Sequence, residues 1–335
     1  MHLTSQLSKA VERIILPLIE PYLHRTLAVG PMHYNRFACQ KGKGARDALL
    51  LLVLSWVRAL NMRKKVAVYC SDVSGAFDKA STSRLVEILR ARGLQEQMVR
   101  LLGSWLRQRR AEVVVGGCKS APISLSNMVY QGTVFGPILW NAFFGGAGEA
   151  VQCADFVEVT YADDLNAFRE FDHLVANDVI EFHLRDCQRS LHDWGDANQV
   201  SFEASKESMH IIARSDSLGE DFRILGITFD VKLTMASAIH EVASEARWRL
   251  KAIWRSHRYH SVAALIGLFK SKVLSFLEYR TAGIYHATDG ALRPLDQVQE
   301  AFLEKLGVSP KEALMNFNLA PLSTRRDIAM LGVIY

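Results

Sequence analysis

One segment, from Lys65 to Asp72, constrains the fold more than any other part of the chain. Every side chain from Val66 to Cys70 is apolar, so both faces of an extended segment here would be apolar. A strand of this kind belongs in the middle of a sheet that is covered on both sides. Its last residue, Asp72, places a carboxylate at the end of that buried strand.

A pair of carboxylates stands in the segment Tyr161 to Asp164, between two stretches that predict the strands of a hairpin, 156–161 and 165–168. If this hairpin pairs beside strand 65–72, Asp72 and the pair Asp163-Asp164 meet at one end of the sheet. Two Mg²⁺ ions, held roughly 3.5 to 4 Å apart by oxygen ligands, stabilise both oxygens of an in-line phosphoryl displacement. These aspartates are therefore candidate catalytic residues and metal ligands.

A Tyr-x-Asp-Asp tetrapeptide by itself is more often a solvated turn, because Asp hydrogen-bonds its own backbone there. Whether the tetrapeptide is only a turn or part of a metal site therefore depends on the segments around it. They predict an α+β core between helical flanks. The predicted elements are a helix over 7–23, interrupted by Pro17 and closed near Pro21, helices over 47–61, 82–93 and 98–106, a strand over 111–115, a helix opened by the glycine-flanked loop 132–136, a helix ending near 194, strands near 201 and 209, a strand over 222–229, and helices beyond 234.

Composition excludes several classes of protein. With 335 residues, 49% hydrophobic and 22% charged, the chain is neither disordered nor fibrous. The longest apolar stretch, Ala48 to Val57, is too short to cross a bilayer, and the N-terminus has no secretory cleavage pattern. We expect a protein with no membrane partner that stays inside the cell, in the nucleus or cytoplasm.

The cysteines and the net charge say less about function than the aspartates do. The 5 cysteines are scattered without metal-ligand spacing, so we expect reduced, mostly buried thiols. Residues 231–335 contain 14 Lys and Arg against 9 Asp and Glu, and this excess equals the net charge of +5 of the whole chain. A basic C-terminal third beside an acidic centre suits a polyanion that lies along one part and reacts at the other.

Several segments occur in a fixed order along the chain, namely Asp72–Asp78, Gln131–Pro137, Tyr161–Asp164, Lys206 and Leu225–Gly226. Together they resemble the palm motifs of reverse transcriptases, and most of all the non-LTR (LINE-type) retrotransposon branch. Supporting segments are Leu7–Arg13, Leu225–Asp230, Leu277–Tyr279 and Pro321–Arg326. The resemblance implies a right-hand polymerase with helical fingers (1–64), an antiparallel-sheet palm (65–230, with a finger insertion around 80–125) and a helical thumb with a C-terminal extension (231–335).

The resemblance also implies the chemistry. The chain would be an RNA-directed DNA polymerase, a nucleotidyltransferase that adds deoxynucleoside triphosphates to the 3′-hydroxyl of a DNA primer on an RNA template. Asp72, Asp163 and Asp164 would hold two Mg²⁺ ions, with Mn²⁺ as a substitute, and Lys206 would protonate the pyrophosphate leaving group. An unperturbed lysine pKa near 10.4 suits such a donor. A solvated surface lysine is the alternative for Lys206.

Further roles carry over to residues around this centre. Phe77 would crowd a 2′-hydroxyl and so select deoxynucleotides, although a core aromatic is the alternative. Gln131 and Gly132 would contact the incoming nucleotide and the template strand, and Leu225 and Gly226 would form the turn that grips the primer. The basic residues predicted to bind the triphosphate are Lys41, Lys43 and Arg46, and those predicted to lie along a duplex are Arg247, Arg249, Lys251, Arg255 and Arg258, interleaved with Trp248 and Trp254. For both basic sets, an ordinary solvated surface is the alternative.

The chain departs from the family pattern in places. Tyr130 stands where relatives commonly have proline before the Gln-Gly pair, and Gln40 stands where they often have arginine. Complete elements of this type carry an endonuclease, and none is visible here, so we expect a truncated copy that needs a separate endonuclease as partner. Two other interpretations stay open: a retired polymerase fold kept as an RNA-binding module, against which the retained aspartates argue, and an enzyme of the viral RNA polymerase or group II intron maturase type. Phe77 argues against the viral type, and the segments Leu225–Asp230 and Pro321–Arg326 argue against a maturase.

Overall fold

The computed structural model describes residues 4–24, 35–107, 109–125 and 128–334, and it divides into two compact units. Unit 1 comprises Met1–Gly44, Ala67–Arg169 and Val175–Met209, and unit 2 comprises Ala45–Val66, Glu170–Leu174 and His210–Tyr335. The predicted boundaries of fingers, palm and thumb at residues 64 and 230 stay predictions.

A four-stranded sheet has the order β6-β7-β1-β8. Its strands are β6 (Val157–Tyr161), β7 (Asp164–Phe171), β1 (Lys65–Asp72) and β8 (Ser208–Ile212). Strand β1 is buried along its whole length up to the partly exposed Asp72, as its two apolar faces predict. Strands β6 and β7 pair antiparallel, with Tyr161 opposite Asp164. The predicted α+β class with an antiparallel sheet is confirmed.

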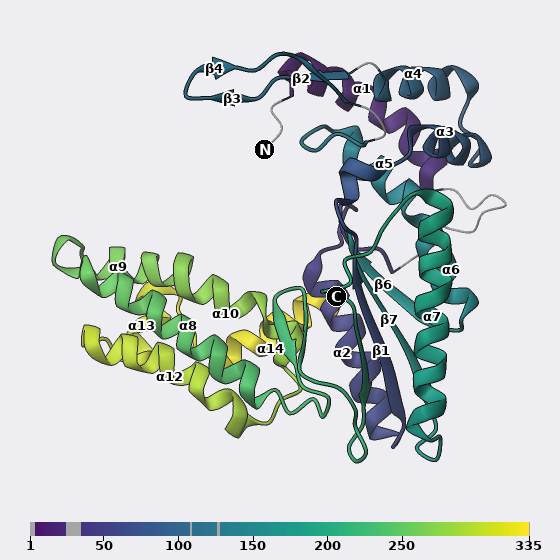
Figure 1. Cartoon of the computed structure of the whole chain (residues 1–335). Coiled ribbons are helices and arrows are strands. Elements are labelled where there is room, and N and C mark those ends of the chain that lie inside the picture. The colour runs from purple at the N-terminus through teal and green to yellow at the C-terminus, as the bar shows by residue number, and fades with distance from the viewer. Residues whose placement is uncertain (1–3, 25–34, 108, 126–127, 335) are drawn as a thin grey trace. The chain divides into compact units, whose positions relative to one another are not determined.

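Helices cover this sheet in unit 1. Helix α7 (Asn177–Asn198) runs alongside β6 and β7 and packs against α6 (Gly145–Cys153) (Figure 1). A second group of helices is formed by α1 (Gln6–His24), α3 (Thr82–Ala91), α4 (Glu96–Leu106) and α5 (Phe135–Phe143), and a short 3₁₀ helix spans Ala76–Lys79. In this group α5 contacts both α1 and α3, so the loop that precedes α5 lies next to the N-terminal helix.

Helix α1 differs from its prediction. We expected an interruption at Pro17 and an end near Pro21, yet the helix continues through both to His24. A proline inside a helix removes one hydrogen bond and crowds the preceding turn. The complete burial of Ile19 and Leu23 stabilises the helical conformation here, so packing outweighs the local cost of the prolines.

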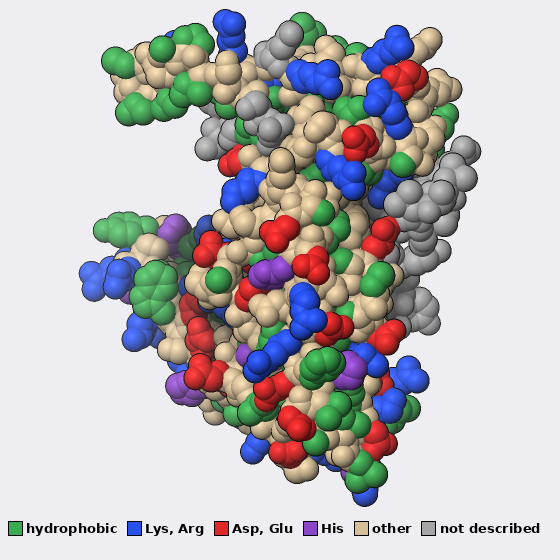
Figure 2. Space-filling view, turned by 45° about the vertical axis from the view of Figure 1, so that its right-hand side comes forward, with side chains coloured by type: hydrophobic (Ala, Val, Ile, Leu, Met, Phe, Trp, Pro, Cys, Tyr) green, Lys and Arg blue, Asp and Glu red, His purple; other side chains and the backbone are tan. Residues whose placement is uncertain are grey.

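Short strands form a two-part hairpin in place of the single strand predicted over 111–115. Strand β2 (Arg109–Ala111) pairs with β5 (Ile123–Leu125), and β3 (Val114–Val115) pairs with β4 (Cys118–Lys119). The valines of β3 are 59% and 72% exposed, and Figure 2 shows the hydrophobic side chains along this hairpin. Because both faces of β3 and β4 are open, no buried face marked where one strand ends and the next begins.

Unit 2 is mainly helical. Its elements are α2 (Ala45–Asn61), β9 (Phe222–Ile224), β10 (Ile227–Phe229), α8 (Ala236–Arg255), a 3₁₀ turn (His257–Tyr259), α9 (Val262–Phe269), a π-helical turn (Lys270–Leu274), α10 (Ser275–Tyr279), α11 (Thr281–Ile284), α12 (Asp289–Leu306), α13 (Pro310–Phe317) and α14 (Leu322–Ile334). Helices α8 and α12 pack side by side (Figure 1). In the described part of the chain, no helix is both long enough and apolar enough to cross a membrane.

Two expectations are corrected by these details. The strand predicted over 222–229 is a hairpin, because Leu225 and Gly226, with φ of 48° and 81°, turn the chain between β9 and β10. The cysteines were expected to be mostly buried, but only Cys70 and Cys187 are, while Cys39, Cys118 and Cys153 are exposed. All five thiols are free in the structure, and their reduced state stays a prediction.

Candidate active site

Asp72, Asp163 and Asp164, called the acidic cluster below, come from two neighbouring strands. Asp72 is the last residue of β1, Asp164 is the first of β7, and Asp163 lies in the turn between β6 and β7. Strands β1 and β7 are adjacent in the sheet, as the meeting of these side chains requires. The sequence prediction that one sheet places all three carboxylates together is therefore met by the backbone.

The turn that carries Asp163 is conformationally unusual. Ala162 has φ of 59°, a left-handed conformation that a residue with a Cβ adopts only at some cost. The indole Nε1 of Trp140, on α5, donates a hydrogen bond of 3.0 Å to the Ala162 carbonyl. This hydrogen bond from a neighbouring helix stabilises the strained turn. It also fixes the position of the backbone directly before Asp163 and Asp164.

The electrostatics of the acidic cluster disfavour three negative charges. Burial, and to a smaller extent the charges of Asp72 and Asp163, together raise the pKa of Asp164 to about 6. The pKa of Asp163 is raised by burial and, to a smaller extent, by Asp72. Like charges held together in this way are stabilised by any cation that approaches them.

Lys206 supplies one such cation. Its ammonium group contacts the carboxylate of Asp72, and this hydrogen bond raises the pKa of Lys206, so the lysine is charged. The Lys206 side chain is 62% exposed, so it reaches the acid from the solvent side. The structure therefore brings the predicted proton donor to the acidic cluster.

Glu207 is a site residue that the sequence analysis missed. Its side chain is 8% exposed. Its carboxylate accepts hydrogen bonds from Tyr69 (2.6 Å) and Gln188 (3.1 Å) and lies 2.7 Å from Nε2 of His192. Burial opposes its charge, but the hydrogen bonds of Tyr69 and His192 lower its pKa overall. Glu207 thus links β1 and α7 to the turn that carries Lys206. Its position directly after Lys206 in the sequence was the signal that could have identified it.

Phe77 lies between the core and the site. Its ring is partly buried, with its centroid 5.3 Å from that of Trp140, and its carbonyl accepts a hydrogen bond of 2.8 Å from the amide of Val129. Trp140 in turn holds the carbonyl of Ala162. Phe77 is therefore connected through one indole ring to the turn of the acidic cluster, and its role as a selector of deoxynucleotides stays a prediction.

Gln131 and Gly132 are exposed at the start of a tightly folded loop. Gly132 has φ of 78°, which favours glycine. The Thr133 hydroxyl donates to the Tyr130 carbonyl at 2.6 Å, and the Gly136 amide donates to Thr133 at 3.0 Å. A Cβ on Gly136 would lie 2.5 Å from the Tyr130 carbonyl oxygen, so only glycine fits there.

Tyr130, which stands where the resemblance led us to expect a proline, is supported by its own contacts. It is 3% exposed, and its hydroxyl donates to the Leu106 carbonyl at 2.8 Å. Its ring packs edge-on against Trp105, and the Arg109 guanidinium lies 5.0 Å from its centroid. Hydrogen bonding and packing thus stabilise the loop where a proline would have done so by restricting φ.

The other predicted site residues are distributed over both units. In unit 1, Lys41 is exposed and Lys43 lies 5.4 Å from the ring centroid of Phe37. In unit 2, Arg46 is exposed at the start of α2, and the Tyr279 hydroxyl donates to the Leu225 carbonyl at 3.1 Å. The predicted roles of these residues and of Gly226 stay predictions.

The donor set of the acidic cluster suits a hard cation, since carboxylate oxygens are the ligands that Mg²⁺ prefers. Among the described residues, however, no group of three or more His, Cys, Asp or Glu side chains is arranged to hold a metal ion. A magnesium ion usually completes its shell with water and substrate phosphates, so two carboxylates suffice. The metal assignment to Asp72, Asp163 and Asp164 stays a prediction.

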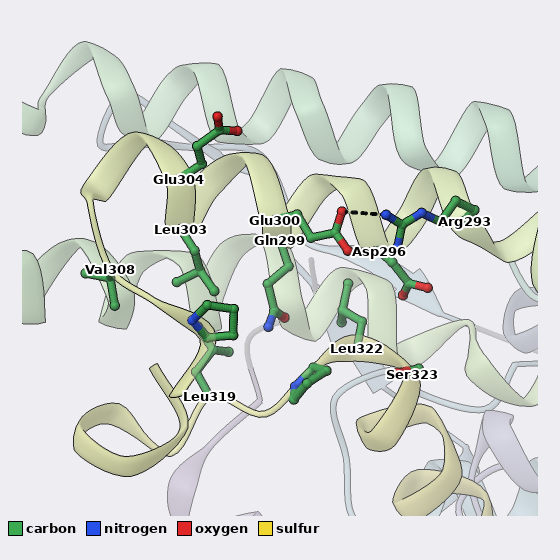
Figure 3. Close-up of a pocket in the computed structure, with 12 residues that line it drawn as sticks. Arg293, Asp296, Gln299, Glu300, Leu303, Glu304, Val308, Leu319, Leu322 and Ser323 are labelled. Carbon is green, nitrogen blue, oxygen red and sulfur yellow. Dashed lines mark hydrogen bonds and ion pairs between the residues drawn. The ribbon is translucent and has the colours of Figure 1, made fainter. Parts of the chain in front are cut away.

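A pocket of about 360 Å³ in unit 2 contains none of the predicted site residues. Its apolar floor includes Leu303 and Leu322, and its rim carries Glu300, which pairs with Arg293 (Figure 3). The pocket lies where α12 faces the start of α14. It is thus a feature of the helical unit, without a group from the acidic cluster.

Comparisons with known proteins agree with the motif resemblance. Residues 1–229 match the family model described as "Reverse transcriptase (RNA-dependent DNA polymerase)". The RNA-directed DNA polymerases from the mobile element jockey of Drosophila funebris and Drosophila melanogaster are 24% and 23% identical over 327 residues. The match covers 92% of this chain but only 35% of each relative's length.

A solved structure supports the fold alone. The apo telomerase from Candida tropicalis is similar with a TM-score of 0.51 and 11% sequence identity. The similarity covers 90% of this chain and 50% of that chain. At this level of identity, the likeness indicates a shared backbone arrangement.

Proposed function

The chain belongs to the reverse transcriptase (RNA-dependent DNA polymerase) family, and we propose that it extends a DNA primer on an RNA template by two-metal phosphoryl transfer. The observation that carries this proposal is the acidic cluster itself, in which two adjacent strands and the turn between β6 and β7 bring three partly buried carboxylates together. Burial first, and then the charges of Asp72 and Asp163, raise the pKa of Asp164 to about 6. Cations would stabilise such a site, and the phosphates of the incoming nucleoside triphosphate would be further ligands for Mg²⁺.

Asp72 and Asp163 would hold two Mg²⁺ ions, with Asp164 as a weaker ligand. Bound there, the ions would stabilise the charge on the attacking 3′-oxygen and on the leaving pyrophosphate. Lys206, already charged and in contact with Asp72, would donate a proton to the pyrophosphate. Glu207 would keep the Lys206 turn against β1 through its hydrogen bond from Tyr69.

Substrate selection would depend on the residues around the acidic cluster. Phe77 would place its ring under the sugar and exclude a 2′-hydroxyl, and the exposed Gln131-Gly132 backbone would approach the nascent base pair. Lys41, Lys43 and Arg46 would neutralise the triphosphate, and the turn Leu225-Gly226 would contact the primer. The chain would act on an RNA template, a DNA primer and deoxynucleotides in the nucleus or cytoplasm.

The test is primer extension with an RNA template, an annealed DNA primer, deoxynucleotides and Mg²⁺. The native chain is compared with Asp163→Asn and with Asp193→Asn, an exposed control on α7. We expect extension by the native chain and the control, and none by Asp163→Asn, while all three bind the primed template equally well in a gel-shift assay.

Two outcomes would contradict the proposal. A folded native chain that binds the primed template without extending it would favour a retired RNA-binding module. Extension that survives in Asp163→Asn would place the chemistry outside the acidic cluster.

A further inference from the structure

Glu12, on the N-terminal helix α1, is a buried carboxylate with no part in the chemistry proposed above. It is 2% exposed, and its oxygens accept hydrogen bonds from four groups. Oε2 accepts from the backbone amides of Val134 (2.6 Å) and Phe135 (3.3 Å). Oε1 accepts from the indole Nε1 of Trp105 (3.2 Å) and the hydroxyl of Ser8 (2.9 Å).

These two amides belong to the start of α5, and only Thr133 separates them from the Gln131-Gly132 pair. The first N–H groups of a helix have no acceptor within the helix and need one from elsewhere. The N-cap residue of α5, Val134, has no side chain that can accept, and Pro137 has no N–H to offer. Thr133 serves the amide of Gly136, so Glu12 is the acceptor that the structure provides for Val134 and Phe135.

The same N-terminal segment contacts the loop at a second point. The hydroxyl of Thr4 donates a hydrogen bond of 3.0 Å to the carbonyl of Gly132. The loop is therefore held at its exposed glycine by Thr4 and at its helical end by Glu12. A carboxylate that meets the positive end of a helix dipole is more favourable than a neutral acceptor.

The aromatic surroundings of Glu12 make this arrangement specific. Trp105, which donates to Glu12, packs edge-on against Tyr130 and Phe135, with ring centroids 5.3 Å and 5.4 Å away. These two residues flank the loop on either side. The carboxylate thus ties α1, α4 and α5 together at the base of the loop.

We propose that Glu12 is a positioning residue that fixes the conformation of the Gln131–Phe135 loop, so that Gln131 and Gly132 meet the template and nucleotide. This inference rests on the proposed function for the role of the loop, and on the hydrogen bonds alone for its conformation. It assigns a purpose to the segment Leu7–Arg13, whose resemblance to relatives carried no role.

The experiment measures hydrogen exchange by mass spectrometry in peptides covering residues 130–136 and, as a reference, residues 157–171 of the β6–β7 hairpin. The variants are Glu12→Gln, Glu12→Ala and the control Arg13→Gln, an exposed neighbour on α1. In Glu12→Gln the amide NH₂ must face either the loop amides or the indole, so at least one hydrogen bond is lost. We expect about tenfold faster exchange in 130–136 for Glu12→Gln, because a neutral amide oxygen is a weaker acceptor for the loop amides than a carboxylate, and more for Glu12→Ala.

A purely structural role for Glu12 predicts a different result. It would speed exchange in both peptides together and lower the melting temperature in step, and that outcome, or unchanged exchange at 130–136 in Glu12→Ala, would overturn the proposal. Primer extension adds a second readout, since misplacement of the loop should raise KM for the nucleotide by on the order of tenfold with a smaller change in kcat. If the native chain extends no primer, the proposed function fails, while the exchange data still decide whether Glu12 holds the loop.

Discussion

Two groups of charged side chains in unit 1 differ in composition: one is a pair of opposite charges, and the other is the acidic cluster of three like charges. Arg36 and Glu158, the buried pair, are 1% and 0% exposed and lie 4.0 Å apart. The Arg36 guanidinium also donates to the backbone carbonyls of Asn141 and Phe144. The acidic cluster is only partly buried, and Lys206 is the cation that contacts it in the described residues.

The comparison separates charges that stabilise the fold from charges that are available for chemistry. Burial lowers the pKa of Arg36 and raises that of Glu158, because desolvation penalises both charged forms, and each charge offsets part of this penalty for the other. In the acidic cluster the neighbouring charges add to the penalty. A folded protein keeps such an arrangement at a cost in stability, and binding of external cations offsets that cost.

The largest effect we expect is on the acidic cluster. Asp163→Asn should lower primer extension by about a thousandfold or more, because it removes a ligand of the reacting ions. Its free energy of unfolding should be unchanged or higher, because one of three like charges is gone. Parallel measurement of extension rate and urea unfolding checks both. A variant that unfolds more easily would show that Asp163 stabilises the fold, and would break the comparison.

Glu158→Gln should have the opposite profile. It leaves the Arg36 guanidinium buried without its counter-charge, and we expect a loss of roughly 3–4 kcal/mol in the free energy of unfolding. Extension per folded molecule should be unchanged. Glu87→Gln is the matched control, because Glu87 pairs with Arg84 on the surface, where both side chains are more than half exposed and a pair contributes less than about 1 kcal/mol. Equal losses in the two variants would contradict the special role of burial.

The sequence predicted the acidic cluster because each part of it is local. The apolar run before Asp72 predicts a buried strand, and two apolar runs around Ala162 predict a hairpin. Only the adjacency of these strands had to be supplied by the fold. Lys206 was assigned by resemblance, and the structure places it on Asp72.

Contacts between residues far apart in the chain could not be predicted in this way. Glu12 accepts from an amide 122 positions away, and nothing in its helical surroundings marks it as a cap. The residue pattern over 222–229 predicted one strand, because a leucine with φ of 48° is an uncommon choice at a turn, and only the resemblance indicated a turn at Leu225-Gly226. The hydroxyl of Tyr279, 54 positions later in the chain, donates a hydrogen bond to the carbonyl of Leu225.

A third kind of buried group sharpens the comparison, since it has neither a charge partner nor a substrate. His210 is 5% exposed and stacks on Phe222 at 4.1 Å, and burial lowers its pKa to about 4. The unfolded chain binds a proton at His210 near its ordinary pKa of 6.5, while the folded chain does not until about 4. Stability should therefore fall as the pH drops through this window, by up to about 3 kcal/mol.

The measurement is the free energy of unfolding of the native chain and of His210→Phe between pH 7 and pH 4. We expect the variant to lose most of this dependence, because phenylalanine cannot titrate. His240→Phe, at an exposed position on α8, is the control. If the free energy of unfolding of His210→Phe depends on pH as strongly as that of the native chain, other groups cause the loss of stability at low pH. His210 would then not be the buried neutral group of this comparison.

Phe77 tests whether one residue can both stabilise the fold and act on the substrate, because its ring would do both. Its packing on Trp140 belongs to the core, and its partly exposed edge is the proposed barrier to a 2′-hydroxyl. Phe77→Val should lower the preference for deoxynucleotides over ribonucleotides by about tenfold or more, the range that a few methylene-sized contacts can discriminate. Phe77→Tyr retains the ring and should retain the preference. The ratio of kcat/KM for the two nucleotides checks both variants. Loss of stability in Phe77→Val without any change in that ratio would make Phe77 a core residue alone, and the selectivity would then have to come from elsewhere around the acidic cluster.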